Sequence, residues 1–138
     1  MAKRATVPAL IPGISAVTLT TGWQDVGAKI NTLGWDRILF HPDITQTDSL
    51  NIRLRVTYEF TFAGTDDRTL LIKNVSASST AVEHSYYEFS TDDDYKSCLN
   101  VELGGGIPFV QLQAQTGTVG STASTIDATT RYNLVRDN

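Results

Sequence analysis

Leu50-Asn51-Ile52-Arg53-Leu54-Arg55-Val56-Thr57-Tyr58-Glu59-Phe60-Thr61-Phe62 is the most regular stretch of the sequence. Its even-numbered residues are all apolar and its odd-numbered residues are all polar. Because successive strand side chains point to opposite faces, this period of two predicts one long strand, straight or bent by a bulge. The even face should lie in the core. The odd face, with Arg53, Arg55 and Glu59, should be a solvated sheet surface or meet an acidic partner.

Shorter segments of the same kind surround this stretch. Clusters of glycine, proline, aspartate and serine separate them, which is the pattern of strands joined by turns. The predicted strands are 14–20, 23–28, 35–41, 69–75, 82–90, 98–103, 108–115, 125–129 and 132–135. The long strand and 69–75 should form a hairpin. We therefore expect an all-β fold, an antiparallel β-sandwich of jelly-roll-like type, with residues 14–138 as a single domain.

Residues 1–13 are predicted to form an extended N-terminal arm. Pro8 and Pro12 lack backbone N–H groups and favour extended geometry in the residues before them, so no helix is expected. The apolar side chains of Val7, Leu10 and Ile11 gain nothing in water, so we expect them to dock on a neighbouring subunit. A frayed terminus is the alternative. With Arg53 and Arg55, these three residues are the predicted partner-binding set.

Composition narrows the class of protein. The chain has 138 residues, a formal charge of −4 and a sequence pI of about 5.0. The 11 basic residues are scattered, which disfavours binding to nucleic acid through a basic face. Cys98 is the one cysteine, so no intramolecular disulfide is expected. With no long apolar run and no signal peptide, a soluble protein made in the cytoplasm and not bound to membranes is predicted.

The clustered carboxylates and glycines are more typical of turns than of metal-binding or phosphate-binding sites. Asp92-Asp93-Asp94 with Asp66-Asp67 offers calcium ligands, but the spacing matches no EF-hand loop and acidic hairpin tips are common. Gly104-Gly105-Gly106 leads into a strand, whereas phosphate-binding glycine loops lead into a helix, so a tight turn is expected. We predict neither a metal nor a cofactor.

The histidines and aromatic residues give no convincing active site either. His41 and His84 are the two imidazoles, and Glu83-His84-Ser85 are consecutive strand residues that face opposite sides and form no triad. We therefore expect no catalytic residues and no enzyme activity. Trp23, Trp35, Tyr86 and Tyr87 are interpreted as packing residues or, alternatively, as a platform that stacks on sugars.

Leu19-Thr20-Thr21-Gly22-Trp23-Gln24-Asp25-Val26-Gly27-Ala28, then Leu33-Gly34-Trp35-Asp36-Arg37-Ile38-Leu39-Phe40, then the long strand, resemble the small jelly-roll decoration or cement proteins of tailed-bacteriophage capsids. The resemblance implies a virion protein on the outer capsid surface that binds the major capsid protein and cements neighbouring subunits. It also implies a homodimer or homotrimer and an arm that orders on binding. Acidic charge suits an exterior position away from DNA, but it leaves Lys3 and Arg4 unexplained.

Two alternatives from other classes remain. The first is a glycan-binding β-sandwich module of a phage tail fibre or baseplate, which requires an exposed tryptophan. The second is an enzyme of the cupin type, which requires a bound metal, although the two histidines have no metal-binding spacing.

Overall fold

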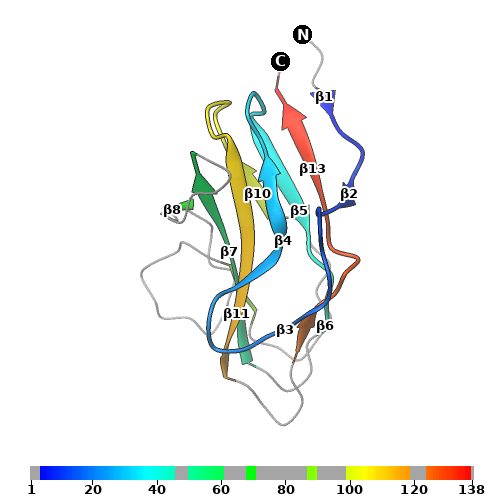
Figure 1. Cartoon of the computed structure of the whole chain (residues 1–138), viewed down its shortest axis with the longest axis vertical. Coiled ribbons are helices and arrows are strands. Elements are labelled where there is room, and N and C mark those ends of the chain that lie inside the picture. The colour runs from blue at the N-terminus through cyan, green and yellow to red at the C-terminus, as the bar shows by residue number, and fades with distance from the viewer. Residues whose placement is uncertain are drawn as a thin grey trace.

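The computed structural model describes residues 4–45, 50–60, 68–70, 87–89, 99–118 and 124–137. All regular secondary structure in these ranges is β-strand, and every strand pairing is antiparallel (Figure 1). The all-β prediction is therefore confirmed. The described part of the chain holds no helix long and apolar enough to cross a membrane.

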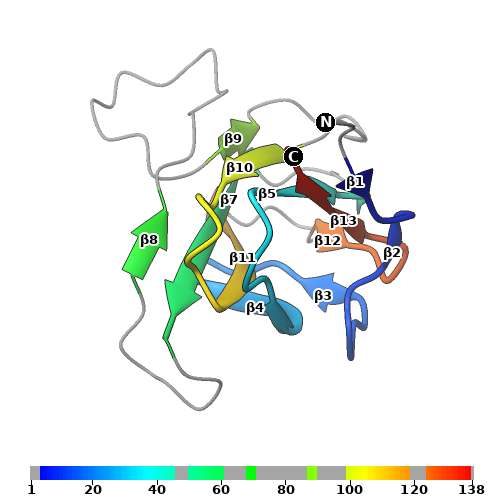
Figure 2. The ribbon, with the colours of Figure 1, turned by 90° about the horizontal axis from the view of Figure 1, so that it is seen from above.

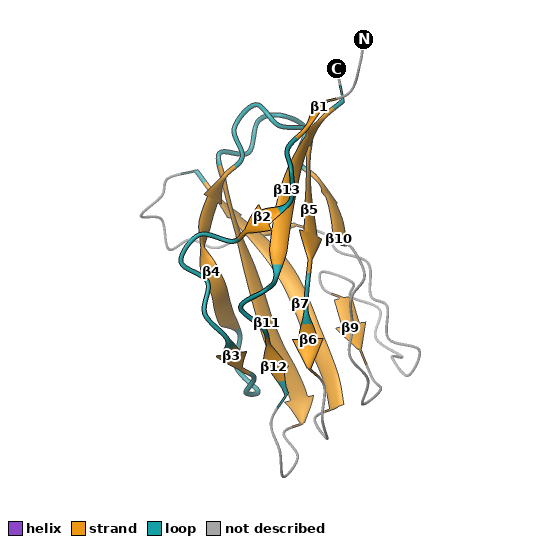
Figure 3. Ribbon diagram, turned by 90° about the vertical axis from the view of Figure 1, so that its right-hand side faces the viewer, coloured by secondary structure: helices purple, strands orange, loops and turns teal. Residues whose placement is uncertain are grey.

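Thirteen strands are assigned in the described ranges. In chain order they are β1 (Arg4–Ala5), β2 (Ala9–Leu10), β3 (Val17–Thr18), β4 (Gln24–Asn31), β5 (Arg37–His41), β6 (Ile44–Thr45), β7 (Leu50–Glu59), β8 (Arg68–Leu70), β9 (Tyr87–Phe89), β10 (Leu99–Glu102), β11 (Phe109–Thr118), β12 (Thr125–Ile126) and β13 (Arg131–Arg136). The first sheet has the order β1-β13-β5-β10, with β2 also on β13. The second has the order β4-β11-β7-β8, with β9 on β7, and the third is β3-β12-β6 (Figure 3).

The structure confirms the long predicted strand as one continuous strand from Leu50 to Glu59, and Thr61 and Phe62 lie outside the described residues. β7 is a single strand of 10 residues that pairs with β11 without a register shift, and its pairing with β8 confirms the predicted hairpin. Ile52, Leu54 and Val56 are fully buried, as the alternation predicts. Phe60 is 58% exposed instead of buried, because the strand ends at Glu59 and alternation no longer fixes the direction of the side chain.

One hydrophobic cluster joins the three sheets. Fully burying an aliphatic or phenylalanine side chain contributes about 1.5–3 kcal/mol, so this cluster is the main source of stability. The second sheet supplies Val26, Ile30, Ile52, Leu54, Val56, Val110, Leu112 and Ala114; the first supplies Ile38, Phe40, Leu99, Val101 and Leu134; the third supplies Ile44 and Ile126. The predicted inward residues of 98–103 and 108–115 are thus in the core.

The N-terminal segment is attached to the body of its own chain. β1 and β2 both pair with β13, beside which Figure 2 shows them on the side away from β7 and β8. The Thr6 amide donates to the Leu134 carbonyl (2.9 Å), and the Leu134 amide donates to Thr6 Oγ1 (2.8 Å). Within the predicted extended arm, Arg4–Ala5 and Ala9–Leu10 thus lie along the edge of the first sheet of their own chain, and docking of the arm on a neighbouring subunit stays a prediction.

Ile11 anchors this segment in the second sheet. Its side chain is 1% exposed and belongs to the core cluster. The register of β4 against β11 shifts between Val110 and Leu112, and Gly27 in this bulge has a φ of 72°. A Cβ at Gly27 would overlap the Ile11 side chain, so the position must be glycine for Ile11 to fit. The expectation that Ile11 contacts a partner is corrected: it packs inside its own chain.

Candidate partner-binding surface

The outward face of the second sheet carries a ladder of polar side chains that hydrogen-bond to one another across three strands. Arg55 Nε donates to Gln113 Oε1 (2.7 Å), and Gln113 Nε2 donates to Asp25 Oδ1 (2.8 Å). The Arg55 guanidinium also lies 4.2 Å from the centroid of the Trp23 ring. A neutral amide thus links a cation on β7 to a carboxylate on β4 across β11, with a cation–π contact at one end.

The two other glutamines of β11 make similar hydrogen bonds. Arg53 Nη1 donates to Gln115 Oε1 (3.1 Å), and Gln115 Nε2 donates to the Thr21 carbonyl (3.1 Å). Gln111 Nε2 donates to the Gly27 carbonyl (2.9 Å) at the bulge. The three glutamines of β11 are 5–8% exposed.

The burial of two further polar residues on this face of β7 changes its interpretation. Thr57 is 0% exposed and Glu59 is 5% exposed, while Arg53 and Arg55 are half-buried. The expectation of a solvated sheet surface beside Glu59 is therefore wrong. Arg53 and Arg55 donate hydrogen bonds to glutamines of the same chain. Their predicted role in binding a partner therefore stays a prediction and is not part of our proposal.

The N-terminal segment presents a different surface at the edge of the first sheet. Val7 is 84% exposed and Leu10 is 47% exposed. Arg4, which is exposed, pairs in register with Arg136, and Leu10 pairs in register with exposed Arg131. We define these five residues, Arg4, Val7, Leu10, Arg131 and Arg136, as the arm edge. It combines exposed apolar side chains with three guanidinium groups.

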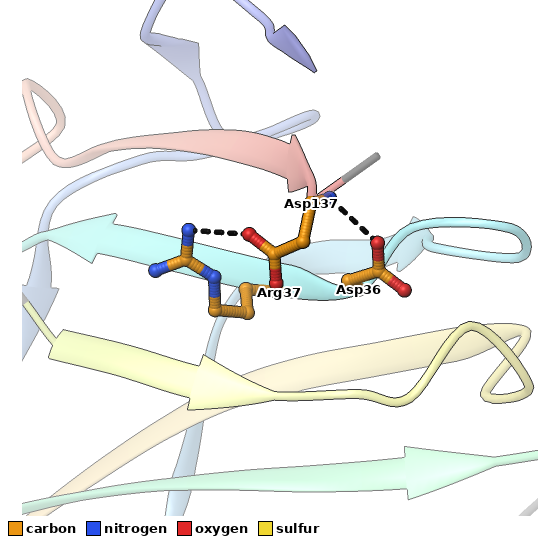
Figure 4. A network of polar contacts seen from close by, with 3 residues as sticks. All are labelled: Asp36, Arg37 and Asp137. Carbon is orange, nitrogen blue, oxygen red and sulfur yellow. Dashed lines mark hydrogen bonds and ion pairs between the residues drawn. The ribbon is translucent and has the colours of Figure 1, made fainter. Parts of the chain in front are cut away.

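Other carboxylates near this end of the first sheet are occupied elsewhere. Asp137 forms an ion pair with Arg37 (Nη2 to Oδ1, 2.8 Å), and the Asp137 amide donates to Asp36 Oδ2 (2.6 Å), as Figure 4 shows. Among the described residues, no carboxylate pairs with Arg4, Arg131 or Arg136.

Arg136 has neutral partners instead. Its Nε donates to the Gly34 carbonyl (3.1 Å), and its guanidinium lies 4.3 Å from the centroid of the Trp35 ring. These contacts hold the side chain in place without cancelling its charge. They also place an arginine over one face of Trp35, as Arg55 does for Trp23, which favours the packing interpretation of both tryptophans over a sugar platform.

The predicted partner-binding residues fall in three places. Val7 and Leu10 lie on the arm edge, Ile11 lies in the core, and Arg53 and Arg55 lie on the second sheet. Sequence reasoning missed Arg131 and Arg136, which flank the predicted strand 132–135. The available signal was the unexplained basic start at Lys3 and Arg4, but the pairing of Arg4 with Arg136 is invisible without the fold.

Polar groups in the described part of the chain contact neighbouring side chains. His41 Nε2 lies 2.6 Å from Asn133 Oδ1, and Asp127 accepts hydrogen bonds from the hydroxyls of Thr45 and Thr125. Gly104 and Gly105 have φ angles of 66° and 80°, in agreement with the predicted tight turn.

No group of three or more potential metal ligands occurs within the described ranges. Asp66, Asp67, residues 83–86, Asp92–Asp94 and Cys98 lie outside those ranges, and Tyr87 is described by its backbone alone. Comparison with protein-family models and with curated proteins finds no match to this chain.

Proposed function

We propose that this chain is a non-enzymatic virion protein that binds the outside of a phage capsid and cements neighbouring major capsid protein subunits. The observation that supports the proposal is the arm edge, where Val7 and Leu10 stand exposed on a segment whose backbone is fastened to β13. Exposed apolar patches mark interaction sites, and Val7 and Leu10 supply exposed apolar surface three residues apart on this edge. The proposal also draws on the resemblance to phage cement proteins.

The attachment of the arm favours binding. Ile11 in the core and the Thr6–Leu134 hydrogen bonds fix the segment before a partner arrives. A segment that is already ordered loses less conformational entropy on association. Many copies, each with a moderate interface, would then stiffen a shell through avidity, and a homodimer or homotrimer would raise it further.

The proposal extends to the whole fold and its location. We propose a jelly-roll-like β-sandwich, which the shared core of the antiparallel sheets supports. The protein would be made in the host cytoplasm and end on the outer capsid surface. The alternative of a glycan-binding module receives no support from the tryptophans, since an arginine covers one face of each ring.

Co-sedimentation with capsid shells tests this function. Shells of the source phage, assembled without this protein, are mixed with increasing amounts of it. Saturable binding in a fixed ratio to the major capsid protein is expected. Failure of the wild-type protein to sediment with the shells would contradict the proposal.

A pair of surface variants tests the arm edge within the same assay. Val7→Asp places a charge in the exposed apolar contact and should weaken shell binding by roughly tenfold or more. Leu33→Asp is the matched control, because Leu33 is 60% exposed but lies beyond β4, outside the arm edge. Both variants should unfold at the same temperature as the wild type, since neither side chain is buried. Equal loss of binding in both would remove the arm edge from the interface.

A further inference from the structure

We infer that the arm edge binds an acidic segment of its partner, with carboxylates of that segment meeting Arg4, Arg131 and Arg136. The inference rests on the proposed function and adds the chemistry of the partner. It also assigns a role to the basic N-terminus, which the acidic composition of the chain leaves unexplained.

The first reason is the direct pairing of two cations. Arg4 and Arg136 are opposite each other in the β1–β13 register. Like charges at directly opposed strand positions repel and lower stability. In the described residues no carboxylate lies within ion-pairing distance of either side chain. A partner carboxylate between the two guanidinium groups would turn this repulsion into attraction.

The second reason is the imbalance between this edge and the rest of the chain. The protein carries a formal charge of −4, so carboxylates outnumber cations. Elsewhere among the described residues arginines have found partners: Arg37 binds Asp137, and Arg55 is linked through Gln113 to Asp25. Three arginines on the two faces of this edge, together with exposed Val7 and Leu10, match an acidic and partly apolar partner surface.

The register also limits how the partner lies. Paired residues share a face of a sheet, so Leu10 and Arg131 lie on one face, while Arg4 and Arg136 lie on the opposite face. Arg131 and Arg136 are separated by about 17 Å along the strand. A partner that contacts both pairs must therefore cross the edge of the sheet.

Addition of a further strand along the arm is less compatible with this edge. Pro8 has no backbone N–H to donate between β1 and β2. Proline on an edge strand is a known obstacle to pairing with another chain. The arm edge therefore offers side chains to its partner more than it offers main-chain hydrogen bonds.

Charge reversal tests the chemistry. Arg4→Glu and Arg131→Glu should each weaken shell binding by roughly tenfold, whereas Arg131→Lys, which keeps the charge, should stay within about twofold of the wild type. Lys29→Glu, in β4 of the second sheet, is the control reversal and should leave binding unchanged. Binding by the wild type should weaken as sodium chloride is raised from about 0.05 to 0.5 M, because salt screens exposed charges.

A zero-length cross-link identifies the partner group. Arg131→Lys introduces an amine that a carbodiimide can couple to a carboxylate in contact with it. Mass spectrometry of the shell-bound variant should show an amide bond from position 131 to an aspartate or glutamate of the shell protein. A phosphate partner such as nucleic acid would leave position 131 without this product and would overturn the inference.

The outcomes distinguish a failure of the proposed function from a failure of the inferred acidic partner. If the wild type does not bind shells, the proposed function fails and the inference fails with it. If the wild type binds but both charge reversals bind equally well and salt has no effect, the cement function stands and the acidic partner is overturned.

Discussion

Two pairs of arginines, one on each large sheet, differ in their surroundings. On the second sheet, Arg53 and Arg55 lie half-buried and donate to glutamines of β11, which donate in turn to Thr21 and Asp25 on the far side. On the first sheet, Arg4 and Arg131 are exposed and have no carboxylate partner in the described structure.

This difference shows that a charged residue at an outward-facing strand position does not by itself identify an interface. On the second sheet, Arg53 and Arg55 are hydrogen-bonded to glutamines of β11, so a partner would have to break those bonds to use them. On the arm edge, Arg4 and Arg131 are exposed, as are Val7 and Leu10. Arg53 and Arg55, which are half-buried and bonded to glutamines of their own sheet, belong to the scaffold, whereas exposed Arg131, in register with Leu10, is a candidate for binding.

Among the variants that compare these two regions, one that disrupts the packing of Ile11 on Gly27 should lower stability the most. Gly27→Val adds a branched side chain at a φ of 72°, where it collides with Ile11, and should cost about 4 kcal/mol or more. Gly104→Val is the matched control, because Gly104 has a φ of 66° but no neighbouring atom within 4 Å of an added Cβ. It should cost about 1–3 kcal/mol. Urea unfolding measures both, and equal costs would show that the packing of Ile11 on Gly27 is unimportant.

Shortening the anchor tests the same attachment without backbone strain. Ile11→Ala removes a side chain that is 1% exposed and should destabilise the fold by about 2–4 kcal/mol. Val7→Ala, at a side chain that is 84% exposed, should stay within about 0.5 kcal/mol of the wild type. Thermal unfolding of the two variants provides the comparison. A small effect of Ile11→Ala would mean that the arm is held by β13 alone.

The ladder of the second sheet should give a smaller but specific effect. Arg55→Ala and Gln113→Ala, alone and combined, form a double-mutant cycle in which the coupling energy should be about 1 kcal/mol. Replacing Arg55→Ala by Arg131→Ala in the cycle should bring the coupling close to zero, because Arg131 lies on the other sheet. Similar coupling in both cycles would contradict the distinction between the two sheets.

The strand pattern was predictable because it depends on local alternation. Ile52, Leu54 and Val56 face the core in β7, and Val110, Leu112 and Ala114 do so in β11. The buried glutamines were not predictable in this way. Glutamine is usually exposed, and the burial of Gln113 depends on neighbours from β7 and β4 that only the sheet order brings together.

The arm edge escaped sequence reasoning for a related reason. Alternation assigns faces to a strand but does not identify its partner, and the pairing of β1 with β13 joins distant parts of the chain. Gly27 gave a usable signal, since a glycine inside a predicted strand marks a bulge or a close backbone approach. That signal points to a neighbour at Gly27 without revealing that the neighbour is Ile11.

The pairing of the N-terminal segment with β13 also sets an order of events during synthesis. The hairpin of β7 and β8 has both of its strands as soon as that region leaves the ribosome, whereas β1 and β2 must wait until residues 131–136 have been made. A nascent chain that stops before Arg131 would leave Leu10 and Arg4 without their strand partners. Prematurely terminated products would thus lack the arm edge.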